Sequence, residues 1–213
     1  MKRFLPSLIF LSGLLAGVAQ AREDAGAELY DAAAPADSAF VRVLNLSSEP
    51  ARAVLSGKNQ AQVIAAGQLG GYRFTPPAET RLEVNGQVAT STLSANTAYT
   101  YVYDGERLRV LQDAFVNEPK KAQVGFYNLT DRELALKTQD GRHAVVDKVA
   151  GGSNASRMVN ELKIGFAAYD GDSRVVSFDE VFLKKGRTYS YLVLPDAGGV
   201  RALALANSLD PLD

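Results

Sequence analysis

Short runs in which apolar and polar residues alternate recur along most of this chain. In Phe40–Leu44 and Tyr99–Tyr103, β-branched, aliphatic and aromatic residues predominate, which is typical of β-strands. Beyond the first 21 residues, no stretch longer than about ten residues repeats its apolar positions at a helical spacing. Comparable runs occupy residues 81–84, 124–127, 145–146, 165–169 and 189–194. The pattern predicts an all-β protein.

Dipeptides that readily adopt a positive φ separate these runs. They are Asn85-Gly86, Asp104-Gly105, Asp140-Gly141 and Asp170-Gly171. Short strands that are interrupted by turns every 8 to 12 residues or so are typical of antiparallel β-sandwiches. We therefore expect hairpin turns at these four places.

The same landmarks occur twice, in the same order. Ser38–Ser47 resembles Lys121–Thr130, which places Asn45 and Asn128 83 positions apart, each at the end of a first strand. Later landmarks recur at offsets that drift from 84 to 90: Ser56-Gly57 with Asp140-Gly141, Asn85-Gly86 with Asp170-Gly171, and Thr97–Val102 with Arg187–Leu192. We predict two tandem antiparallel β-sandwich domains formed by an internal repeat. At both Asn45 and Asn128 we expect an Asx turn, in which the side chain bonds the backbone two residues on.

The repeat also suggests domain boundaries. A polar stretch with a proline, Asn117–Lys120, interrupts the strand pattern. The predicted domains are residues 38–116 and 120–206. An Ala-rich, acidic segment at 22–37 is expected to be a flexible lead-in, and residues 207–213 a C-terminal tail.

The first 21 residues have the pattern of a secretory signal peptide. Lys2 and Arg3 precede an apolar run, Phe4–Val18, and Ala19-Gln20-Ala21 supplies the small residues of a cleavage site. We expect cleavage after Ala21 and export to the periplasm. The alternative is a retained membrane anchor, but the run is shorter than the roughly 20 apolar residues that span a bilayer.

Composition narrows the chemistry further. The chain has no cysteine and one histidine, which excludes disulfides, thiolate zinc sites, iron–sulfur clusters and a two-histidine metal site. Without Lys2 and Arg3 the chain keeps 21 basic and 24 acidic residues, a formal charge of −3, so nothing favours nucleic acid as a partner. We predict no cofactor and no metal.

Two motifs invite a catalytic interpretation, and neither holds. Gly171-Asp172-Ser173 resembles the nucleophile block of one esterase class, but no histidine follows it to act as base. The repeat places the same residues at a hairpin turn. His143 follows another predicted turn, where an exposed loop histidine is the favoured interpretation. Asp170 and Asp172 lack the remaining ligands of a calcium loop. We predict no catalytic residue.

Weak candidates for binding remain. Tyr99, Tyr101 and Tyr103 share one strand face at a spacing of two, so they either pack in the core or stack on a ligand. Tyr103 is the best candidate for stacking, since Val193 occupies its position in the second copy. Lys184 and Lys185, like Lys120-Lys121 and Arg187, could contact an anionic polysaccharide or a partner's acidic patch, but a solvated surface is the favoured interpretation.

The chain also resembles the AlgF family of periplasmic alginate O-acetylation proteins. The resemblance runs in order over residues 27–205. It is carried by Ala27–Tyr30, Ala34-Pro35, Ser38–Val43, Val124–Leu129, Leu136–Gly141 and Ala168–Asp172.

This resemblance implies a role in adding acetyl esters to the mannuronate residues of alginate. It implies three partners: a membrane-bound O-acyltransferase and periplasmic acetyltransferases of the AlgJ-like and AlgX-like kinds. The family is sometimes called an acetyltransferase. For this chain the residues instead favour a non-catalytic adaptor, because no activated nucleophile is recognisable.

Two other hypotheses stay open. A polysaccharide-binding module would present alginate to an acetyltransferase through Tyr103, Lys184 and Lys185. An acetyl carrier would use a serine or His143.

Overall fold

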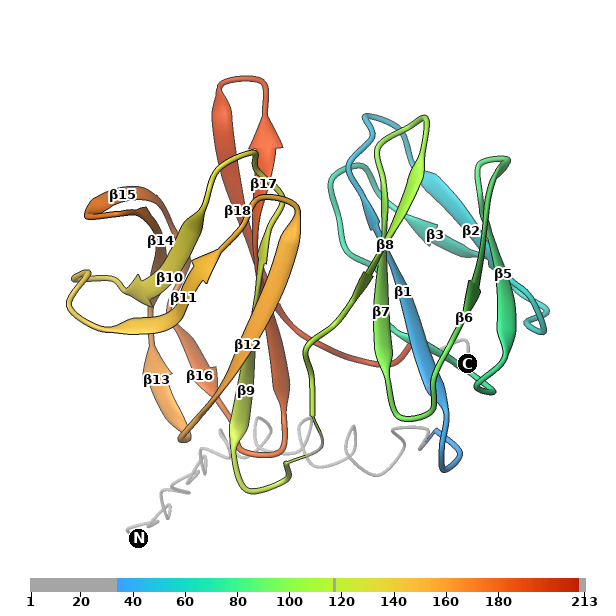
Figure 1. Ribbon diagram of the computed structural model, residues 1–213, viewed down its shortest axis with the longest axis horizontal. Helices are drawn as coiled ribbons and strands as arrows, with labels where there is room; N and C mark the ends of the chain where they lie inside the picture. The colour runs from blue at the N-terminus through green and yellow to red at the C-terminus, as the bar shows by residue number, and fades with distance from the viewer. Residues whose placement is uncertain (1–33, 117, 211–213) are drawn as a thin grey trace, which may run out of the picture. The chain divides into compact units, whose positions relative to one another are not determined.

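The computed structural model describes residues 34–116 and 118–210. These residues form 18 β-strands and no helix, which confirms the all-β class (Figure 1). In this part of the chain, therefore, no helix is of a length and apolarity that would let it cross a membrane. The predicted signal peptide, residues 1–21, and the segment 22–33 lie outside the described residues.

The first half contains two four-stranded sheets, in the orders β4-β1-β7-β8 and β3-β2-β5-β6. Its strands are β1 (Ala39–Asn45), β2 (Ala51–Leu55), β3 (Gln62–Ile64), β4 (Arg73–Thr75), β5 (Glu79–Val84), β6 (Gln87–Thr92), β7 (Ala98–Tyr103) and β8 (Leu108–Gln112).

The second half contains the sheets β12-β9-β17-β18 and β11-β10-β14-β15, with a further pair, β13-β16. Its strands are β9 (Ala122–Asn128), β10 (Leu134–Thr138), β11 (Ala144–Val149), β12 (Ser153–Val159), β13 (Leu162–Ile164), β14 (Phe166–Asp170), β15 (Ser173–Ser177), β16 (Val181–Leu183), β17 (Thr188–Asp196) and β18 (Gly199–Ala206).

The strand orders of the two halves correspond, which confirms the internal repeat. In each half the first strand lies beside the strand that begins the last hairpin: β1 pairs with β7, and β9 pairs with β17. Both of these pairs are parallel, so each of these two sheets is mixed rather than purely antiparallel. A parallel pair needs a long connection, and the chain makes it through the opposite sheet of the same half. The pair β13-β16 is separate from β14-β15, whereas the matching residues of the first half belong to the continuous pair β5-β6.

A hydrophobic core lies between the two sheets of each half. In the first half Val41 and Val43 of β1 lie beside Tyr99 and Tyr101 of β7 and share one core with them. The residues that point to the other face of this sheet, such as Leu44 and Val102, are also buried. Both faces of the central strands are therefore covered, and the residues on the second face join a third apolar cluster with side chains of the second half.

The predicted Asx turns are present at both repeats. Asn45 Oδ1 accepts the backbone N–H of Ser47 at 3.0 Å, and Asn128 Oδ1 accepts that of Thr130 at 3.1 Å. Each amide group also reaches carbonyl oxygens outside its turn; Asn128 Nδ2 donates to Arg132 at 2.6 Å and to Val149 at 2.8 Å. Both asparagines are fully buried. Each one therefore joins the end of a first strand to two neighbouring loops.

Residues 207–210 differ from the predicted tail. Leu209 forms a parallel bridge with Tyr72, which precedes β4 in the first half. Tyr72 donates its N–H to Ser208 O at 2.9 Å, and Asp210 donates its N–H to Tyr72 O at 2.7 Å. The end of the second half thus pairs with the first half.

Candidate functional site

The three tyrosines of β7 face the interior of the first half. Tyr103 is 4% exposed, and its hydroxyl donates a hydrogen bond to Gly105 O at 2.9 Å. Tyr99 and Tyr101 belong to the same core. The prediction that the three share a face is confirmed. The stacking role considered for Tyr103 is wrong, because its ring is inaccessible to a sugar or a partner.

His143 lies in the exposed turn between β10 and β11. Its backbone N–H donates to Thr138 Oγ1 at 3.2 Å, and its carbonyl accepts the N–H of Thr138 at 2.9 Å. Hydrogen bonds from the Thr138 hydroxyl and the Arg142 N–H hold the pKa of Asp140 below its usual value. These contacts form the predicted hairpin turn, with Gly141 at a φ of 73°.

Gly171-Asp172-Ser173 forms the turn between β14 and β15. Gly171 has a φ of 57°, and Asp170 pairs with Ser173 across the turn. The turn interpretation of this motif is therefore confirmed. Among residues 34–116 and 118–210, no group of three or more His, Asp or Glu side chains could hold a metal ion.

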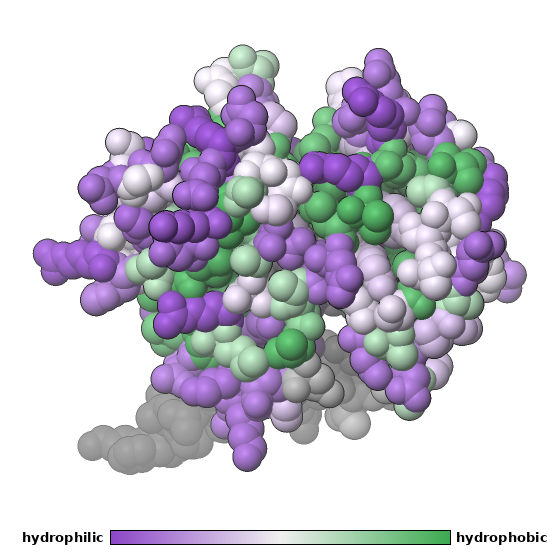
Figure 2. All heavy atoms as spheres, viewed as in Figure 1, coloured by the Kyte–Doolittle hydropathy of each residue, from purple (hydrophilic) through white to green (hydrophobic). Residues whose placement is uncertain are grey.

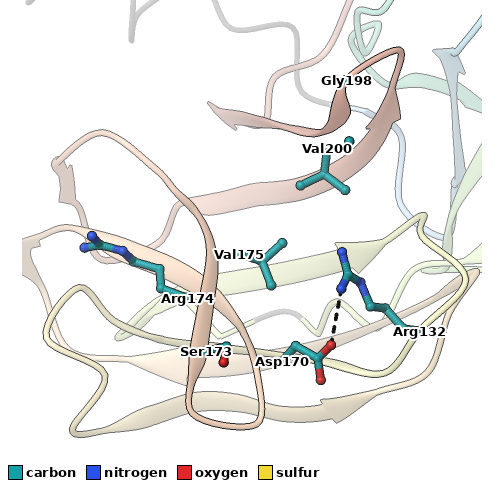
Figure 3. A pocket seen from close by; sticks show the side chains of 8 residues that line it. Arg132, Asp170, Ser173, Arg174, Val175, Gly198 and Val200 are labelled. Atoms are coloured by element: carbon teal, nitrogen blue, oxygen red, sulfur yellow. Dashed lines mark hydrogen bonds and ion pairs between the residues drawn. The ribbon is translucent and has the colours of Figure 1, made fainter.

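An open hollow of about 710 Å³ lies beside this turn (Figure 3). Arg132 Nη1 lies 3.4 Å from Asp170 Oδ2, and both side chains are about half exposed. Arg174 points away from this pair, while Val175 and Val200 form an apolar wall (Figure 3). The described residues that line the hollow include Ser173 but no histidine, so the Ser173 hydroxyl has no imidazole base there.

The most unusual polar residue of the structure is Arg42, in the middle of β1. Its side chain is 1% exposed. Because Val41 and Val43 point into the first core, Arg42 points out of the other face of the sheet. Residues of the second half cover it there, so Arg42 lies at the junction of the two halves.

Equivalent residues of the two halves hold this guanidinium. Nε donates to Thr100 Oγ1 at 2.9 Å, and Nη2 donates to Ser190 Oγ at 3.0 Å; these hydroxyls occupy matching positions in β7 and β17. Nη1 donates to Asn207 Oδ1 at 2.8 Å, and Asp113 Oδ2 lies 3.9 Å from Nη2. Asp113 and Asn207 also occupy matching positions, each directly after the last strand of its half. Asp113 donates its N–H to Ala98 O at the start of β7, and Asn207 donates its N–H to Thr188 O at the start of β17.

Two tyrosines complete the enclosure of Arg42. The guanidinium lies 4.2 Å from the ring centre of Tyr72, and its Nη2 donates to Tyr127 Oη at 2.8 Å. The Tyr72 hydroxyl donates to Asp113 Oδ2 at 2.7 Å. Burial raises the pKa of both tyrosines, so both hydroxyls stay protonated. Burial by itself would lower the pKa of Arg42, but its interactions with Tyr127, Tyr72 and Asp113 outweigh that effect and raise it.

Further contacts at the same junction surround this cluster. Arg109 Nη1 donates to Gly152 O at 3.0 Å, and Arg201 Nη2 donates to Gly67 O at 2.7 Å. Asn154 donates its amide N–H to Gln112 O at 3.0 Å. Apolar side chains fill the space between, including Leu44, Val102, Tyr127 and Leu192. This buried charge joins the two halves, because separating them would leave Arg42 without Tyr127, Ser190 and Asn207.

The sequence pattern gave no indication that Arg42 is buried. A polar residue between two valines in a strand normally indicates the solvent face. The one available signal was Leu44, two residues along, which is apolar on that same face. The repeat equivalent of Arg42 is Gly125, so comparing the two halves did not indicate a buried charge.

The structure brings together the two lysine pairs that looked independent in the sequence. Gly186 donates its N–H to Lys121 O at 2.8 Å, which places Lys184-Lys185 beside Lys120-Lys121 at one end of the second half. All four lysines are exposed. Lys121 Nζ also donates to Asn160 Oδ1, which adds the β12–β13 loop to the group. Lys184 and Lys185 therefore belong to a surface built from three segments.

Comparisons with known proteins point to one family. A model of the family described as "Alginate O-acetyl transferase AlgF" matches residues 11–190. The chain is 34% identical over 182 residues to the alginate biosynthesis protein AlgF of Pseudomonas putida, which covers 84% of each chain. It is 30% identical over 205 residues to the AlgF protein of Azotobacter vinelandii, covering 94% of this chain and 89% of that one.

Among solved structures, the chain is similar to the C-terminal domain of AlgF from Pseudomonas aeruginosa, with 31% sequence identity. The match covers 41% of this chain and 99% of that domain, with a TM-score of 0.38.

Proposed function

Because this chain belongs to the AlgF family, and so to alginate O-acetylation, we propose that it works there as a non-catalytic adaptor in the periplasm. Its partners are a membrane-bound O-acyltransferase and AlgJ-like and AlgX-like periplasmic acetyltransferases. The chain holds these enzymes together while acetyl groups move to the mannuronate residues of the polymer.

The junction at Arg42 is the observation that carries this proposal. An adaptor is effective when its two binding surfaces keep a fixed separation, since flexible linkage dilutes the effective concentration of one partner near the other. Arg42 of the first half donates to Tyr127, Ser190 and Asn207 of the second. This network supports one rigid body with surfaces on both halves.

A non-catalytic role predicts that single candidate nucleophiles and bases are dispensable. In a strain that lacks the chain, His143→Ala and Ser173→Ala should each restore the acetyl content of secreted alginate to the level given by the unaltered chain. The acetyl content is measured on the purified polymer, and immunoblots confirm equal amounts of each variant.

An adduct analysis separates the adaptor from an acetyl carrier. Mass spectrometry of the chain recovered from acetylating cells should find no covalent adduct of about 42 Da, the mass of an acetyl group, on any serine or on His143. Such an adduct, together with loss of acetylation when that residue is replaced, would contradict the adaptor and identify a carrier.

A further inference from the structure

The second half carries a separate two-stranded ribbon, β13-β16, where the first half has the start of β5 and the end of β6. Lys163 of β13 lies directly opposite Phe182 of β16. Phe182 is 49% exposed, although phenylalanine is usually among the buried residues. In the first half Thr92, opposite Glu79, occupies the matching position, because Ser94 bonds Tyr99 as Lys184 bonds Tyr189. The fold therefore does not require an aromatic side chain there, and an exposed one indicates a role outside the fold.

The end of this ribbon is fixed to the core. The Tyr189 hydroxyl donates to Phe182 O at 3.2 Å and accepts the N–H of Lys184 at 2.9 Å. Glu161 Oε2 accepts the N–H of Lys185 at 3.2 Å. Phe182 and the two lysines that follow it therefore stand on an anchored backbone, which limits the ordering that binding would require.

The lysines at this end have no acidic partners. Among the residues that the structure describes, no carboxylate lies within 4.0 Å of Nζ of Lys120, Lys184 or Lys185. The nearby Glu118 accepts the N–H of Lys120, as Glu161 does that of Lys185, so both carboxylates serve the backbone. The formal charge without residues 1–21 is −3, so these three ammonium groups form a local positive charge on a chain of negative net charge.

The two faces of the ribbon differ. Leu162 and Ile164 point toward the core and line a partly apolar hollow of about 350 Å³ next to Lys121. Phe182, opposite Lys163, points to the outer face of the ribbon. Figure 2 shows, for the face in view, that apolar side chains lie between hydrophilic ones rather than in one continuous sheet.

We propose that this surface, defined by Lys120, Lys121, Lys184, Lys185 and Phe182, docks an acidic segment of a partner protein that carries an apolar side chain. The inference rests on the proposed adaptor role and names the surface that one partner occupies. The lysines recognise the acidic residues, and the exposed ring of Phe182 packs against the apolar side chain. A uronate polymer would satisfy the lysines but has no apolar side chain to pack on Phe182, which favours a protein.

The test measures affinity for a purified AlgJ-like or AlgX-like acetyltransferase, with residues 22–213 as the binding chain. Lys184→Glu with Lys185→Glu should weaken binding about tenfold or more at low ionic strength, with a smaller effect at about 0.5 M salt. Phe182→Ala should weaken it at both. The matched controls are Arg107→Glu with Lys148→Glu for the charge change and Val63→Ala for an exposed apolar residue; neither should alter the affinity.

Each outcome decides the question. If the unaltered chain binds and the Lys184/Lys185 reversal binds equally well, the docking surface is wrong while the adaptor stands. If the unaltered chain binds neither acetyltransferase, the adaptor proposal fails and the surface fails with it. If the reversal keeps its affinity for the acetyltransferase but loses affinity for mannuronate oligomers, the surface binds the polymer instead. Should the reversal fold poorly by circular dichroism, Lys184→Gln with Lys185→Gln and Phe182→Ala give the same decision.

Discussion

At the scale of single residues, Arg42 determines how the two halves meet. Its guanidinium donates four hydrogen bonds, to acceptors in both halves, and the charge lies near Asp113, with both side chains almost fully buried. Burying such a pair costs desolvation free energy, so the pair is stable only while all of its partners are present.

Arg42→Ala should therefore lower the free energy of unfolding by about 3–5 kcal/mol, because Asp113 would remain buried without its counter-charge. Urea denaturation measures the change, with the exposed Arg107→Ala as the control. Replacing Arg42 and Asp113 together by Met and Leu should cost less than the sum of the two single replacements. A loss below about 1 kcal/mol in Arg42→Ala would contradict the role given to this residue.

Tyr191 supplies an independent prediction about pH. Its hydroxyl is buried without a hydrogen-bond partner among the described residues, and burial raises its pKa to about 12 from the ordinary value of 10.0. The folded state thus keeps this proton between about pH 10 and pH 12 while the unfolded state loses it, so stability falls as the pH rises through that window. Below the lower limit Tyr191 contributes no pH dependence.

Tyr191→Phe should remove part of that alkaline loss. At pH 7 the same replacement should leave stability unchanged or raise it by about 1 kcal/mol, because it deletes an unpaired buried polar group. Thermal unfolding at pH 7 and at pH 11 measures both effects. A clear destabilisation at pH 7 would mean that the hydroxyl has a partner in solution.

At the scale of strands and turns, the repeated asparagines hold the first strand of each half to its neighbouring loops. Asn128 accepts the N–H and hydroxyl of Thr130 and donates to two carbonyl oxygens. Asn128→Ala should lower the free energy of unfolding by about 2–4 kcal/mol, since several buried backbone groups lose their partner at once. The exposed Asn59→Ala is the control, and equal stability of the two variants would contradict this role.

Much at this scale could be predicted from the sequence. The strands, the Gly-containing turns and the Asx turns follow from local residue types, because alternation and positive φ are properties of a few neighbouring residues. The parallel pairs β1-β7 and β9-β17 could not be predicted, since strand direction in a sheet depends on the path of the chain between them. The burial of Tyr103 and of Arg42 likewise depends on what covers each face.

Only part of the proposed docking surface could be predicted from the sequence. Lys184 and Lys185 were identified as exposed charges, but their proximity to Lys120-Lys121 arises from backbone pairing between residues 65 positions apart, Lys121 and Gly186. Phe182 gave no signal, because an apolar residue in a short strand normally indicates the core.

At the scale of the whole molecule, the described residues should unfold as one unit. The junction combines the Arg42 network, a shared apolar cluster and the pairing of residues 208–210 with Tyr72. Calorimetry of residues 22–213 should give a single transition whose calorimetric and van't Hoff enthalpies agree. Arg42→Ala should separate it into two transitions. Two transitions in the unaltered chain would show instead that the halves are independent.

The adaptor role is tested most directly by asking whether the chain connects two enzymes. A tagged periplasmic acetyltransferase is purified from detergent-solubilised cells with and without the chain, and the co-purified membrane-bound O-acyltransferase is quantified. We predict that the O-acyltransferase co-purifies when the chain is present and is lost when the chain is deleted. Equal recovery of the O-acyltransferase in both strains would contradict the adaptor role.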